Sequence, residues 1–161
     1  MFDKFGEFDS AAEINETAVN LRREGDIESL KVLAQENGID PDILQAFIDG
    51  DILYICDDMT AALGKLDVEV QNMECAEIIL DWVEYIKNEC FEKPEVARAV
   101  RKKGKSLAGC ITELLKWGLK NQYPISQEIQ KAAGVTAGKC TLGIPGTATA
   151  KKIITKYYTG K

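Results

Sequence analysis

The residues whose types and spacing are best suited to chemistry are the cations around Gly104, Lys105 and Ser106. These three residues match the end of a phosphate-binding loop, but the full motif needs a glycine where Ala99 stands and a strand where a helix is expected. The pattern therefore excludes a nucleotide triphosphatase. A serine that opens a helix still leaves backbone N–H groups pointing outward, so the segment predicts an anion site suited to backbone phosphate.

The predicted polyanion-binding or partner-binding residues lie on two basic segments, one around this loop and one in the last predicted helix. They are Arg98, Arg101, Lys102, Lys103, Lys105, Ser106, Lys151, Lys152 and Lys156. In the helix before the loop, we expect Val96, Ala97 and Val100 to face the core and the arginines to lie on the opposite side. A solvated basic loop without a ligand is the alternative.

Two further patterns are weak signs of nucleic-acid binding. Residues 143–146 (GIPG) match the GXXG loop of the KH module, which clamps a nucleic-acid backbone. Residues 107–119, 121–125 and 126–133 have the order helix, turn, helix of a DNA-reading motif. Both patterns are common by chance. Short motifs such as GXXG have many false matches, and helical hairpins occur in most all-α domains.

Catalysis has little support because the chain contains no histidine. This absence excludes a Ser-His-Asp triad, a Cys-His pair, histidine general bases and most zinc sites. The acidic half holds many carboxylates, but none stands isolated in an apolar stretch that predicts a raised pKa. We therefore expect a protein that is not an enzyme and that uses neither a metal nor a cofactor.

The cysteines predict a reducing environment. Cys56, Cys75, Cys90, Cys110 and Cys140 form no CxxC pair, and their number is odd. The first residues lack the apolar core of a secretory signal, and no apolar run approaches the length of about 20 residues that a membrane span requires. We expect five unpaired thiols in a cytoplasmic protein that has no membrane partner.

Charge is segregated along the 161 residues. Residues 1–95 contain 24 acidic and 7 basic side chains, a net charge of −17, whereas residues 96–161 contain 2 acidic and 13 basic side chains, a net charge of +11. Such asymmetry is typical of a surface that meets a polyanion. The alternative is that the two halves neutralise each other within one fold.

The elements that must position these residues are predicted to be helical. Capping signals mark the ends of three short helices in residues 1–50, which form an acidic N-terminal helical unit. Residues 51–161 are predicted to form a main helical domain with a basic C-terminal half. The longest periodic stretch is residues 66–91, and residues 136–144 favour a small β-hairpin. The predicted fold is a mainly α, multi-helix single domain with one small hairpin near the C-terminus.

A family resemblance rests on residues 98–110 (RAVRKKGKSLAGC), 142–146 (LGIPG) and 151–158 (KKIITKYY). These runs resemble the PcfK-like proteins of conjugative and other mobile elements, and residues 5–10 (FGEFDS) are similar to the longer members. That group includes anti-CRISPR inhibitors of the RNA-guided type II nuclease. The resemblance therefore implies a mobile-element protein that blocks a host nuclease.

The sequence as a whole predicts binding without catalysis. We expect a nuclease inhibitor whose acidic half imitates nucleic acid in the basic channel of a CRISPR effector nuclease. The alternative is a nucleic-acid-binding accessory protein of a conjugative or phage element, which uses the basic half. Both hypotheses leave formation of a homo-oligomer open.

Overall fold

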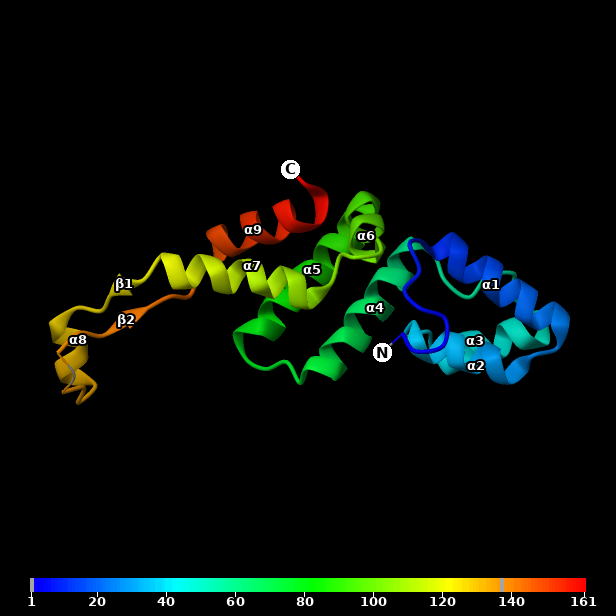
Figure 1. Ribbon diagram of the computed structural model, residues 1–161, viewed down its shortest axis with the longest axis horizontal. Helices are drawn as coiled ribbons and strands as arrows, with labels where there is room; N and C mark the ends of the chain where they lie inside the picture. Colours follow the sequence, from blue (N-terminus) through cyan, green and yellow to red (C-terminus); the bar gives the residue numbers. More distant parts are fainter. Residues whose placement is uncertain (1, 137) are drawn as a thin grey trace. The chain divides into compact units, whose positions relative to one another are not determined.

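The computed structural model describes residues 2–136 and 138–161, and over these ranges the chain is mainly helical. Nine helices and two short strands follow one another in the described chain (Figure 1). The expected mainly α class, with one small antiparallel strand pair near the C-terminus, is confirmed. None of the helices in these ranges combines the length and the apolarity needed to cross a membrane.

The chain divides into two compact units, Met1–Ala108 and Gly109–Lys161, which we call the first unit and the second unit. The first unit has 24 acidic and 12 basic residues, a net charge of −12, and the second has 2 acidic and 8 basic residues, a net charge of +6. The segregation of charge thus follows the division of the fold. Residues 1–50 lie within the first unit, and their status as a domain of their own stays a prediction.

Local capping signals mark the ends of the first three helices. These are α1 (Ala11–Glu24), α2 (Ile27–Glu36) and α3 (Pro41–Asp49). The Ser10 side chain accepts a hydrogen bond from the Glu13 N–H, Asp26 accepts one from the Ser29 N–H, and Pro41 occupies the first turn of α3. Their apolar faces meet in a core that includes Ile14, Ala18, Leu30, Leu33 and Phe47.

Three more helices complete most of the first unit. They are α4 (Asp58–Met73), α5 (Ile78–Glu92) and α6 (Pro94–Arg101), and α4 packs against both α5 and α6. The periodic stretch of residues 66–91 is divided between two helices, α4 and α5. Glu74 and Glu77 have φ values of 49° and 51°, so the chain turns between α4 and α5. The apolar spacing from residue 79 onward belongs to α5 alone.

Helix α4 meets the turn between α2 and α3 through a direct backbone contact. A Cβ atom at Gly64 would lie 2.2 Å from the Asn37 carbonyl oxygen. One at Gly38, where φ is +63°, would lie 2.5 Å from the Gly64 carbonyl oxygen. Only glycine permits this approach, which ties the first three helices to α4.

The second unit contains most of α7 and all the elements that follow it. These are α7 (Leu107–Lys120), β1 (Tyr123–Pro124), α8 (Gln127–Ala132), β2 (Thr141–Leu142) and α9 (Thr147–Thr159). Helix α9 runs back alongside α7, while α8 lies at the far end of the strand pair and buries no residue (Figure 1). Strand β1 separates α7 from α8, so they lack the simple turn of a helix-turn-helix.

The expected hairpin within residues 136–144 is wrong in its partner strand. Strand β2 falls in that range, but it pairs antiparallel with β1, which lies in the segment expected to be a turn. The Ile125 N–H donates to the Cys140 carbonyl oxygen at 2.9 Å, and the Thr141 hydroxyl bonds the Gln122 side chain at 3.0 Å. These bonds favour the longer-range pairing. Ala137, in the expected range, lies outside the described residues.

Candidate polyanion-binding site

The nine residues predicted from the sequence fall in both units. Six of them, from Arg98 to Ser106, belong to the first unit, and Lys151, Lys152 and Lys156 belong to the second. Each group is therefore described within its own unit. Polyanion binding at these positions stays a prediction, but the surroundings of each side chain differ greatly.

Arg101 lies in the core, so its expected place on the exposed side of α6 is wrong. Its side chain is 1% exposed, and one guanidinium N–H donates to the Asn37 side-chain oxygen at 2.9 Å. The buried residues of α6 are Val96, Ala97, Val100 and Arg101, so the arginine extends the apolar face. Burial lowers the pKa of Arg101, although nearby carboxylates such as Glu7 oppose the shift. Arg101 thus contributes to packing in the first unit.

Carboxylates of the first unit already bind the backbone of the basic loop. Asp9 accepts a hydrogen bond from the Lys103 N–H at 3.0 Å, and Glu7 accepts one from the Gly104 N–H at 3.0 Å. At the start of α7, Glu69 accepts a bond from the Leu107 N–H at 2.9 Å. An internal carboxylate therefore occupies the helix end where an external anion was expected.

Side chains of the same region continue this internal pairing. Arg98 forms an ion pair with Asp58 at 3.2 Å. Lys102 and Lys103 have exposed side chains, whereas Lys105 and Ser106 are half-buried. The basic segment of the first unit is thus balanced in part by neighbouring carboxylates.

A buried ionic cluster lies beneath this loop. Lys65 is fully buried, forms an ion pair with Glu7 and donates to the Lys102 carbonyl oxygen at 3.0 Å. Burial lowers the pKa of Lys65, and its carboxylate neighbours oppose that shift. Burial raises the pKa of Glu69, against the effect of the Leu107 N–H. Glu69 thus has a raised pKa that the sequence did not predict, but the bonds of the cluster are those of a structural element.

A pocket of about 490 Å³ lies between α7 and α9, and one of the three predicted lysines of the second unit lines it. Lys151, Lys152 and Lys156 are exposed, and Lys156 lines the pocket. The residues that line it are Glu113, Lys116, Trp117, Lys120, Asn121, Ile153, Lys156 and Tyr157. Three lysines, two aromatic rings and a single carboxylate therefore line the same pocket.

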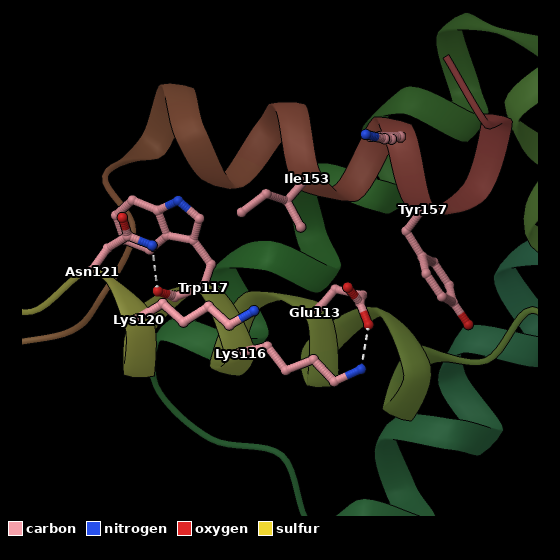
Figure 2. A pocket seen from close by; sticks show the side chains of 8 residues that line it. Glu113, Lys116, Trp117, Lys120, Asn121, Ile153 and Tyr157 are labelled. Carbon is pink, nitrogen blue, oxygen red and sulfur yellow. Dashed lines mark hydrogen bonds and ion pairs between the residues drawn. The ribbon is translucent and has the colours of Figure 1, made fainter.

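Figure 2 shows how these side chains lie. Ile153 points from α9 toward α7, between Trp117 and Tyr157. Lys116 forms an ion pair with Glu113 at 2.8 Å, which neutralises the carboxylate within the pocket. The Asn121 side chain donates to the Trp117 carbonyl oxygen at 2.8 Å, and this bond holds it at one end of the pocket.

Helical spacing explains why these residues share the pocket. Residues 113, 116, 117 and 120 follow one face of α7, and residues 153, 156 and 157 follow one face of α9. Lys156 was predicted from the sequence as a site residue, whereas Trp117 and Tyr157 were not. The spacing of lysine and aromatic residues by three or four positions is the signal that could have found them.

Two further pockets lie in the first unit and have a different chemistry. One of about 590 Å³ is lined by α1 and by Tyr54, and its lining includes Arg23 and the carboxylates of Glu16, Asp57 and Asp58. Another, of about 520 Å³, lies between α2 and α3. Among the described residues, no group of cysteine and carboxylate side chains is arranged to hold a metal ion.

No protein-family model, no curated protein and no solved structure matches this chain, so the resemblance to the PcfK-like proteins stays a prediction.

Proposed function

We propose that the second unit binds nucleic acid, without catalysis, through the face formed by α7 and α9. The observation that carries the proposal is the pocket that Lys116, Lys120 and Lys156 line together with Trp117 and Tyr157. Lysines neutralise backbone phosphates, and aromatic rings stack on bases. The proposed setting is the cytoplasm, where free thiols such as the five of this chain persist.

The charge of the second unit supports the proposal. Its eight lysines are all exposed, and only two carboxylates, Glu113 and Glu128, oppose them. A net charge of +6 on a unit of this size attracts phosphate over a distance of about 8 Å at physiological salt. Clustered lysines on one face are the usual electrostatic footprint of a nucleic-acid-binding protein.

The test is a salt titration of binding to a labelled single strand of about 12 nucleotides, a typical length for such sites. Contacts from Lys120 and Lys156 give a log–log slope of roughly −1.4, since each neutralised phosphate contributes about −0.7. The variant Lys120→Glu/Lys156→Glu should flatten the slope by about 1.4. Binding that is absent, or that does not respond to salt, contradicts the proposal.

The matched control is Lys31→Glu/Lys93→Glu, which changes the net charge equally but alters exposed lysines of the first unit. The control should keep the slope of the unaltered chain. Equal weakening by both variants would show that overall charge, and not the face formed by α7 and α9, determines binding.

A second candidate function is inhibition of a type II RNA-guided nuclease, as the resemblance implies. The net charge of −12 on the first unit favours it, because such nucleases hold their heteroduplex in a basic channel. The loop between α3 and α4 also exposes Leu53 and Tyr54, at 70% and 65%, close in sequence to Asp51 and Asp57. Exposed apolar side chains among carboxylates suit a basic protein surface.

The two candidates are separated by variants in different units. In a cleavage titration with a type II effector, Leu53→Ser/Tyr54→Ala should relieve inhibition, whereas Trp117→Ala should leave it unchanged. Failure to co-elute with the effector or to reduce its cleavage contradicts this second candidate.

A further inference from the structure

The pocket between α7 and α9 offers more than a set of cations. We propose that it accepts unpaired bases, which stack on Trp117 and Tyr157, so that the second unit prefers single-stranded over double-stranded nucleic acid. This inference rests on the proposed function and names its substrate class. Lysines alone can bind either form of nucleic acid, whereas the aromatic rings can favour single strands over duplexes.

The shape of the site fits bases. Its volume of about 490 Å³ lies within the range of small-molecule pockets. Trp117 and Tyr157 are each half-buried, so packing holds the rings while part of each surface remains accessible. Ile153 lies between them and gives the pocket an apolar floor (Figure 2). The two rings thus provide stacking surfaces at successive points along the pocket.

The charges at the rim place phosphates beside these rings. Lys120 on α7 and Lys156 on α9 line the pocket from its two sides. Glu113 would repel a phosphate, but its ion pair with Lys116 at 2.8 Å offsets that repulsion. A strand whose bases enter the pocket therefore has cations within reach of its backbone.

A duplex cannot use the site in the same way. Its bases are paired and stacked inside the helix, so a base must be unpaired before it reaches a protein pocket. Duplex therefore meets the lysines alone, whereas a single strand meets the lysines and the rings. Stacking tolerates every base, so we expect little dependence on sequence.

The chain contains two tryptophans, which makes the test direct. In the variant Trp82→Phe, Trp117 is the remaining tryptophan and reports on the pocket. Three labelled probes of equal length, about 12 nucleotides, are compared: oligothymidine, its duplex with oligoadenine, and an abasic backbone. We expect oligothymidine to quench Trp117 fluorescence and to bind about 5- to 150-fold more tightly than the abasic backbone.

Variants then assign the preference to the rings. Trp117→Ala should remove a large part of the preference for oligothymidine over the abasic backbone, and Trp117→Phe should restore most of it. Trp117→Ala/Tyr157→Ala should bring the two affinities to the same value. Tyr54→Ala, which removes an exposed aromatic ring of the first unit, is the control and should change neither affinity.

The outcomes separate the two proposals. Equal affinity for oligothymidine and the abasic backbone, with no quenching, overturns base binding and leaves the proposed function intact. Tighter binding of duplex than of single strand also overturns it. No binding of any probe overturns both proposals.

Discussion

The two units consist of similar helices but use charge in opposite ways. The first unit buries Lys65, Glu69 and Arg101 and binds the backbone of its basic loop with its own carboxylates. The second unit exposes all eight of its lysines and has two carboxylates to balance them. Several charged groups of the first unit therefore contribute to its fold, whereas the lysines of the second unit lie at its surface.

The largest effect that tests this contrast should come from Lys65→Met. Loss of the buried ammonium removes one of the two cations that act on Glu7 and Glu69, and removal of one member of a buried pair costs about 3–5 kcal/mol. Urea unfolding followed by circular dichroism measures the change. The matched variant Lys152→Met, on an exposed lysine of the second unit, should change stability by less than about 0.5 kcal/mol.

Rescue distinguishes an uncompensated charge from a packing defect. Addition of Glu7→Gln and Glu69→Gln to Lys65→Met should recover much of the lost stability. No recovery would mean that the methionine itself does not fit, and the contrast between the units would rest on shape and not on charge.

A smaller effect is expected at the two glycine contacts. Gly64→Ala places a Cβ 2.2 Å from the Asn37 carbonyl oxygen, and Gly118→Ala places one 1.9 Å from the Gly143 carbonyl oxygen. Overpacking of this kind costs about 1–3 kcal/mol, or more against backbone atoms. Gly146→Ala, where no atom lies within 4 Å of the added Cβ, is the control.

These variants also test the division into units. Trp82 reports on the first unit and Trp117 on the second, so Gly64→Ala should shift the Trp82 transition and Gly118→Ala the Trp117 transition. If every variant shifts both transitions together, the units unfold as one cooperative body.

The stability of the first unit should change with pH by less than the glycine variants change it. Two carboxyls, Glu7 and Glu69, should contribute pH dependences of opposite sign. Burial would raise the pKa of Glu7, but bonds from Lys65 and the Gly104 N–H outweigh it and lower the pKa below 4.5. The stability that Glu7 contributes is therefore present above that pH and is lost as pH falls through its lowered pKa. Glu69 has a raised pKa, so stability increases as pH falls through that value.

Unfolding midpoints between neutral pH and about pH 3 measure these slopes. Glu7→Gln should flatten the loss of stability on the acid side, and Glu69→Gln should steepen it. Identical profiles for the two variants would contradict the opposite shifts.

The smallest expected effect is a difference in the rates at which the thiols are labelled. Labelling confined to accessible thiols should leave stability unchanged. Burial raises the pKa of both Cys56 and Cys90 to about 12, from 9.0, so few of these thiols are ionised near neutral pH. Cys75 and Cys140 are half-buried and should react first with iodoacetamide. Mass spectrometry should detect five labels after unfolding without reductant, and fast native labelling of Cys56 would contradict the expected order.

The sequence predicted most helix ends because caps are local. Ser10, Asp26 and Pro41 act on atoms within a few residues, so their roles follow from spacing. The buried charges were missed because residue type was given more weight than position. Arg101 follows Val100 on the buried face of α6, and Lys65 and Glu69 share the buried face of α4 with Ala61 and Leu66.

The candidate site was predicted only in part, for a different reason. Lys156 was identified from its charge, but the pocket also needs Trp117, which lies 39 residues earlier. The pairing of β1 with β2 returns the chain so that α9 lies beside α7 (Figure 1). Helix α8 lies between the two strands in the sequence, so a short-range hairpin signal could not predict their pairing.

The bonds from Glu7 and Asp9 to the loop after α6 also determine when the first unit can fold during synthesis. They join residues 97 and 94 positions apart, so neither bond can form until the loop has left the ribosome. At about 5–20 residues per second, the N-terminal carboxylates wait roughly 5–20 seconds for their partners. During that interval the nascent chain depends on the local contacts of α1, α2 and α3, and the first unit closes only as its last segment emerges.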